Sequence, residues 1–127
     1  MAAALAWTQR LRLGVGLLPV PLRNVALTAM EVATLDRLFP DRVRVGVGHG
    51  VQDWMAQVGA RVESPVTLLR QYLTALRALL RGEQVTVRGR YVNLDGWRWS
   101  GRRPGPRRCT PARPVHVVAG EVRPLVG

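Results

Sequence analysis

The alternation of strand-like and helical periodicity over residues 10–48 restricts the fold of this chain more than any other feature. Residues 10–18 alternate in hydropathy and run into a proline-rich turn, which predicts a buried strand that ends in a loop. Residues 24–39 carry apolar side chains at helical spacing behind Asn24, a residue type that caps helices. Residues 42–48 alternate again. Because a helical crossover lets two strands pair in parallel, this order predicts an α/β fold.

A second helix and a hairpin follow. Ser64 fits the cap of a helix that runs to about residue 81, and Gly82 fits the position just after its end. Residues 49–63 are predicted to form a loop, and residues 85–94 a short hairpin with a glycine-bearing turn. The apolar positions that we expect to be buried are Val25, Ala29, Val32, Leu35 and Leu38 in the first helix, Val43, Val45 and Val47 in the strand, and Leu69, Leu73, Leu76 and Leu80 in the second helix.

The length and composition exclude several classes of protein. A chain of 127 residues, 47% hydrophobic and 21% charged, has the composition of one small soluble domain. No run of 18 apolar residues is present, so we expect no membrane span and a cytoplasmic protein. Cys109 is the only cysteine, which excludes an internal disulfide. With only two histidines beside it, the sequence predicts no metal site.

The net charge of +11 has a simple explanation in the coding sequence. All nineteen basic residues are Arg, and the chain contains no Lys and no Ile. Since Lys and Ile have AT-rich codons and Arg has GC-rich codons, a GC-rich genome accounts for the charge without selection for phosphate contacts. An Arg-rich nucleic-acid-binding protein, with residues 97–127 as a basic arm, stays open as an alternative from a different functional class.

The pattern changes near Gly96. Residues 97–127 cluster Arg, Gly and Pro, and only residues 115–118 have the composition of a strand. We therefore expect a domain over residues 1–96 and an irregular, basic tail over residues 97–127. The tail is expected to be disordered or to result from a shifted reading frame.

Four segments carry a family resemblance: residues 10–18, 34–38, 41–50 and 89–94. The third, Asp41-Arg42-Val43-Arg44-Val45-Gly46-Val47-Gly48-His49-Gly50, is the most specific. In this order and spacing they resemble the bacterial-luciferase-like oxidoreductases that depend on flavin or coenzyme F420, over residues 5–96. The resemblance implies a (β/α)8 TIM barrel with these segments around its third and fourth strands. Such a barrel takes roughly 250 residues, so a partial barrel is expected, truncated at both ends, without strands one, two and five to eight.

The resemblance also implies a cofactor site at the carboxyl ends of these strands. The matching positions are Val15, Gly16, Gly48, His49 and Gly50. A planar ring can approach a backbone closely only where no Cβ intervenes, which accounts for the glycines. The implied cofactor is coenzyme F420, with FMN as the alternative.

Some residues depart from the family pattern or leave their role open. Val15 stands where many F420-dependent relatives have Thr, and Gln71 stands where relatives often have Glu. Arg44 is expected to point into the bottom of the barrel, where it would need a carboxylate partner. Trp54 either covers the cofactor or packs the loop. Asp53 is interpreted as a surface carboxylate without a catalytic role.

The function implied by the resemblance is hydride transfer between a deazaflavin or flavin and a small organic substrate, with the cofactor supplying the redox chemistry. The alternative within the family is an FMN-dependent monooxygenase. Since only part of a barrel is expected, we predict that the isolated chain is inactive as an enzyme. The implied partners are the cofactor and its substrate, with no membrane and no nucleic acid, and family members are often homo-oligomeric.

Overall fold

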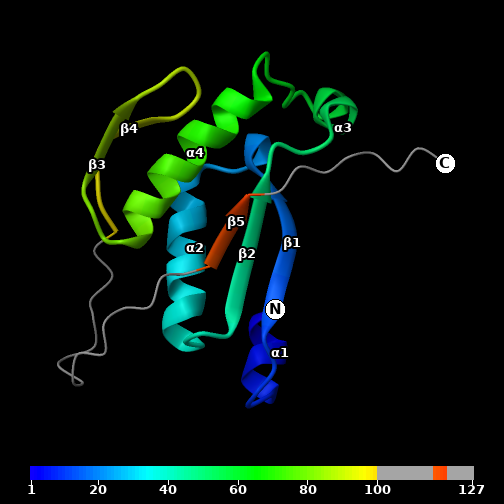
Figure 1. The fold of residues 1–127 in the computed structure, drawn as a ribbon, viewed down its shortest axis with the longest axis vertical. Coiled ribbons are helices and arrows are strands. Elements are labelled where there is room, and N and C mark those ends of the chain that lie inside the picture. The colour runs from blue at the N-terminus through cyan, green and yellow to red at the C-terminus, as the bar shows by residue number, and fades with distance from the viewer. Residues whose placement is uncertain (100–115, 120–127) are drawn as a thin grey trace.

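A three-stranded parallel sheet forms the centre of the computed structural model, which describes residues 1–99 and 116–119 (Figure 1). The strand order is β1 (Leu13–Pro19), β2 (Val43–Gly48) and β5 (His116–Ala119), and both pairings are parallel. The predicted α/β fold with a parallel strand pair is therefore confirmed. Strand β5 overlaps residues 115–118, the one part of the tail that has the composition of a strand.

Helices cover one face of this sheet. The helix α2 (Val25–Leu38) joins β1 to β2, and α4 (Pro65–Leu80) follows β2 and packs against α2 (Figure 1). Asn24 caps α2 as predicted, because its Oδ1 accepts a hydrogen bond from the backbone N–H of Ala26 at 2.8 Å. The shorter helices are α1 (Ala2–Trp7), the 3-10 helix η1 (Val20–Leu22) and α3 (Gln52–Gln57).

The core lies between the sheet and these helices. Val43, Val45 and Val47 are buried, as the alternation of β2 predicts. In the same core, the hydroxyl of Tyr72 in α4 donates to Thr28 Oγ1 in α2 at 2.7 Å, so these two buried polar groups satisfy one another. The core therefore ties both helices to β2.

The antiparallel hairpin of β3 (Val85–Arg88) and β4 (Asn93–Trp97) lies on the outer side of α4 (Figure 1). This arrangement explains a wrong prediction for α4. Only Leu76 of the expected leucine stripe is fully buried, whereas Leu69, Leu73 and Leu80 are partly buried. Since α4 packs against α2, η1 and the hairpin, its buried face is wider than one stripe, and the other fully buried members are Leu68, Tyr72, Ala75 and Leu79.

Three further details differ from the expectations. The six-residue helix α3 lies within the segment predicted to be a loop, because a helix of this length leaves no clear periodicity. Leu38, the last apolar position expected in α2, is 63% exposed at the end of that helix. The strand β4 continues through Gly96 to Trp97, so the position chosen as a boundary lies inside a strand.

Candidate functional site

The candidate site lies where the parallel strands β1 and β2 end. Pro19 pairs with Gly48 at the end of the register, so the two strands leave the sheet at the same level. His49 and Gly50 follow Gly48 directly. The structure thus places three of the five predicted cofactor-binding residues at the carboxyl end of the sheet, where α/β folds bind ligands.

Three glycines lie on the face of β1 and β2 opposite the core, beside the exposed side chain of Arg44. These glycines, which we call the glycine surface, are Gly14, Gly16 and Gly46. A Cβ built on Gly16 would meet nothing within 4 Å, so this residue borders open space. A Cβ on Gly46 would lie 2.6 Å from the carbonyl oxygen of Gly16, so the two backbones are too close for any side chain at position 46.

A bulge in β1 produces this close approach. The register shifts between the pairs Val15–Val45 and Leu18–Val47, and Gly16 lies within the shift. The carbonyl oxygen of Val15 is 3.2 Å from the position of a Cβ on Gly46. The bulge therefore brings backbone oxygens of β1 over the glycine of β2.

Val15 lies in β1 directly before the bulge. It pairs with Val45, whose side chain belongs to the core, and paired residues of parallel strands share a face of the sheet. The Val15 side chain therefore lies on the helix-covered face, and only its backbone reaches the glycine surface. Gly16 is the member of this predicted pair that lies on the open face.

His49 is held by the backbone of the loop after β2. Its Nδ1 lies 2.7 Å from the carbonyl oxygen of Gly50. Since a carbonyl oxygen can only accept, Nδ1 carries the proton in the neutral ring, and Nε2 is the nitrogen without one. Gly50 has a φ of +73°, and a Cβ there would lie 3.1 Å from Sδ of Met55, so the loop depends on glycine at this position.

Three other residues that the sequence singled out are Arg44, Trp54 and Asp53. Arg44 lies on the same sheet face as the glycine surface and is exposed there. Trp54 in α3 is 63% exposed and Asp53 lies in the first turn of the same helix. Within residues 1–99 and 116–119, no group of three or more His, Cys, Asp or Glu could hold a metal ion.

A pocket of about 340 Å³ opens at the same end of the sheet, on the helix side. The connection from β1 to α2 contributes Val20, Arg23 and Asn24, α4 contributes Tyr72, and the hairpin contributes Tyr91. We call this feature the η1 pocket. Sequence reasoning missed it, because its walls come from three segments that are distant along the chain.

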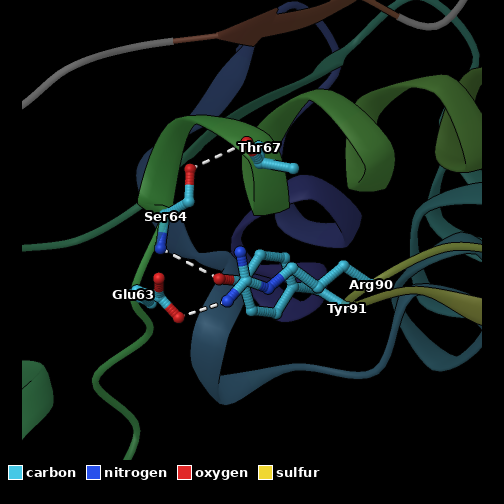
Figure 2. A network of polar contacts seen from close by, with 5 residues as sticks. All are labelled: Glu63, Ser64, Thr67, Arg90 and Tyr91. Carbon is cyan, nitrogen blue, oxygen red and sulfur yellow. Dashed lines mark hydrogen bonds and ion pairs between the residues drawn. The ribbon is translucent and has the colours of Figure 1, made fainter.

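A polar network fixes the wall that the hairpin provides (Figure 2). The Ser64 N–H donates to the hydroxyl oxygen of Tyr91 at 2.9 Å, and Arg90 forms an ion pair with Glu63. The Ser64 hydroxyl donates to Thr67 Oγ1 at 2.7 Å, so Ser64 occupies the predicted cap position of α4 without a side-chain cap bond to the helix backbone. The network joins the end of the loop after β2 to the turn of the hairpin.

Gln71 holds the same turn from α4. Its Oε1 accepts hydrogen bonds from the backbone N–H groups of Tyr91 at 3.0 Å and Val92 at 3.3 Å. A Cβ on Gly89 would lie 2.6 Å from this oxygen, so the turn packs directly on the Gln71 side chain. Gln71, where the sequence departs from the family pattern, therefore has a structural role, because its oxygen accepts both bonds of the turn.

Two buried or half-buried groups have raised pKa values, and one of them contributes to the η1 pocket. Burial raises the pKa of the Tyr72 phenol, although its hydrogen bond to Thr28 acts in the opposite direction. Burial and the nearby carboxylate of Asp41 raise the pKa of Asp36 in α2. Both groups therefore favour the neutral form at neutral pH more than exposed groups of the same type.

Two predictions concern residues that the structure does not describe. Cys109 and most of the proposed nucleic-acid arm over residues 97–127 lie outside the described residues. In the part of the chain that is described, no helix is long and apolar enough to cross a bilayer.

Comparisons with known proteins agree with this fold. The solved structure of the coenzyme F420 dependent tetrahydromethanopterin reductase from Methanopyrus kandleri superposes with a TM-score of 0.65 and 25% sequence identity, over 75% of this chain and 31% of that one. An uncharacterized protein from Mycobacterium tuberculosis is 38% identical over 122 residues, which cover 94% of this chain and 41% of the relative.

Two relatives with named activities cover smaller parts of the chain. The 5,10-methylenetetrahydromethanopterin reductase of Methanolobus tindarius is 32% identical over 70% of this chain and 27% of its own length. The F420-dependent glucose-6-phosphate dehydrogenase of Nocardia farcinica is 35% identical over 76% of this chain and 30% of its own length. The chain thus spans less than half the length of these curated relatives.

The match to a family extends almost to the end of the sequence. The family described as luciferase-like monooxygenase matches residues 1–124, which includes most of the segment after Gly96. The partial-barrel fold is confirmed by the parallel sheet and by the solved structure that it matches. The chain belongs to the luciferase-like monooxygenase family.

Proposed function

We propose that the protein to which this chain corresponds is an oxidoreductase that transfers a hydride between coenzyme F420 and a small organic substrate. The observation that carries the proposal is the similarity to proteins named as F420-dependent, in sequence and in fold. In this proposal the deazaflavin supplies the hydride chemistry, and the protein binds and orients its ring. Location in the cytoplasm and assembly with further copies stay predictions.

The residues at the carboxyl ends of β1 and β2 fit a planar ring. No Cβ projects from Gly16 or Gly46, and Gly16 borders open space closer to the ends of these strands than Gly14 does. A ring placed there would contact backbone atoms along its face. His49 and Gly50 would border the ring at the level where the strands end. This geometry supports binding and orientation by backbone contact.

A second candidate is an FMN-dependent monooxygenase, since the family description names monooxygenases. FMN also carries a planar tricyclic ring, so the glycine surface fits both cofactors. The first candidate requires tighter binding of coenzyme F420, and the second requires tighter binding of FMN. Comparing the two affinities distinguishes them.

The test is an equilibrium titration of the purified chain with coenzyme F420 and, separately, with FMN. We expect tighter binding of F420, and no turnover by the isolated chain. Gly16→Ala should weaken F420 binding at least about tenfold, because the added methyl group keeps the ring from the backbone. Val66→Ala, at an exposed position of α4, is the control and should bind as the unaltered chain does. Equal affinity of Gly16→Ala and the unaltered chain would contradict the proposed site, and tighter binding of FMN would favour the second candidate.

A further inference from the structure

The η1 pocket has the chemistry of a small-molecule site separate from the glycine surface. We propose that it binds small organic acids, with the apolar body in the pocket and the carboxylate at Arg23. The proposal does not depend on the function of the glycine surface, because none of the pocket residues that it uses belongs to that surface.

The floor of the pocket is apolar and withdrawn from water. Val20, Val25, Leu68 and Val92 line it, and each is at most 6% exposed. A volume of about 340 Å³ lies in the range of pockets that hold small ligands. An apolar body of one or two fused rings would therefore replace water against these side chains, which favours binding.

Arg23 and Asn24 provide hydrogen-bond donors at the pocket. Arg23 uses Nη1 for its 2.7 Å bond to Glu31, and a guanidinium has five N–H donors, so Nη2 and Nε can bind a second acceptor. Asn24 uses Oδ1 to accept from Ala26, which leaves its amide N–H groups as donors. The described residues that line the pocket include no Asp or Glu. A carboxylate is the ligand group that accepts from all of these donors and complements the charge.

The ion pair of Arg23 does not prevent this role. Its side chain is 41% exposed and that of Glu31 is 58% exposed, so the pair is a solvent-screened contact of small energy. The bond to Glu31 also restrains the Arg23 side chain before a ligand binds. The conformational entropy that Arg23 loses on binding is therefore smaller.

The opposite wall is fixed before any ligand binds. Tyr91 is held through its hydroxyl by the Ser64 N–H and through its own N–H by Gln71. Val92 donates its N–H to the same Gln71 oxygen. Because these bonds order the hairpin turn in advance, ligand binding needs little rearrangement of that wall.

The experiment compares 2-naphthoate with 2-naphthamide, which has the same ring system and no charge, on the full 127-residue chain. Calorimetry gives the two affinities, and amide NMR shifts locate the ligand. We expect 2-naphthoate to bind about tenfold more tightly or better, with shifts at Asn24, Leu68 and Val92. Equal affinity for both compounds, binding of neither, or shifts confined to other residues would overturn the proposal.

Three variants separate the effect of the Arg23 charge on binding from the effect of the pocket volume. Arg23→Gln should remove the preference for 2-naphthoate and leave binding of 2-naphthamide unchanged. Arg70→Gln removes the same charge from an exposed position on α4 outside the pocket, and should leave the preference intact. Val62→Phe places a larger side chain in the pocket and should weaken both compounds. If Arg70→Gln reduced the preference as much as Arg23→Gln, the effect would come from net charge alone and the site would be refuted.

Discussion

Gly16 and Gly46 lie side by side at the bulge of β1, yet a side chain would meet different surroundings at each position. At Gly46 the obstacle is backbone, the carbonyl oxygen of Gly16 at 2.6 Å, which cannot rotate away as a side chain could. We expect Gly46→Ala to lower the free energy of unfolding by about 1–3 kcal/mol, as overpacking does in a tight interior. Gly16→Ala should change it by less than about 0.5 kcal/mol, because the added methyl group meets only open space. Urea denaturation measures the free energy of unfolding of both variants. Equal decreases for Gly46→Ala and Gly16→Ala would contradict the close contact between the Gly16 carbonyl and Gly46.

Asp36 makes stability depend on pH in a defined direction. Burial and the carboxylate of Asp41 raise its pKa in the folded chain, so the folded state holds this proton to a higher pH than the unfolded chain does. The contribution of Asp36 to stability is therefore complete below the ordinary pKa of an Asp, and it is lost as the pH rises through the raised pKa.

Asp36→Asn should consequently raise the midpoint of thermal unfolding at about pH 7 and have little effect at about pH 3. Asp53→Asn, which removes a carboxylate from the first turn of α3, is the control and should not raise the midpoint at about pH 7. A lower midpoint for Asp36→Asn at about pH 7 would mean that the carboxylate of Asp36 stabilises the fold.

Single residues also mark the limit of prediction from sequence. Asn24 as a cap and Gly82 just after α4, where it has a φ of +80°, follow from local chemistry and were predictable. Val15 pairs with Val45, and its carbonyl oxygen lies 3.2 Å from the position of a Cβ on Gly46, a contact that no sequence pattern contains. The bulge that brings Gly16 over Gly46 depends on the pairing of two strands, which a sequence pattern does not contain.

Among the elements, the hairpin depends on a helix that precedes it in sequence. Gln71 of α4 provides the acceptor for the N–H groups of Tyr91 and Val92. Gln71→Leu removes that acceptor and should lower the free energy of unfolding by about 1–3 kcal/mol, because both donors lose their partner. Gln71→Glu keeps an oxygen at this place and should cost less than Gln71→Leu. Hydrogen exchange at Tyr91 and Val92 distinguishes the two, and fast exchange in both variants would contradict the role given to the oxygen.

The elements that sequence predicts well are those whose burial follows one periodicity. The strand β2 alternates between a valine face in the core and an open face, and its prediction is confirmed. The helix α4 is covered on more than one side, so its buried positions differ from the single leucine stripe. The helix α3 is too short to give a pattern, and the η1 pocket needs three segments to be placed together before it exists.

At the scale of the whole molecule, the sheet has one face covered by helices and one face that carries the glycine surface. In a (β/α)8 barrel the covered face points outward to the helices and the other face points to the barrel interior. The parallel order β1, β2, β5 and the family match over residues 1–124 place this chain within such a barrel. The Arg-rich composition, by contrast, carries no part of the functional account.

The place where coenzyme F420 binds can be read from the NMR spectrum of the ¹⁵N-labelled chain during addition of the cofactor. Backbone amides report where the ring lies without requiring turnover. The account predicts shifts at Gly16, Gly46 and His49, and none at Gly59 or Gly82, glycines that lie outside the site. Saturating F420 without shifts at the glycine surface, or with shifts at other positions only, would contradict it.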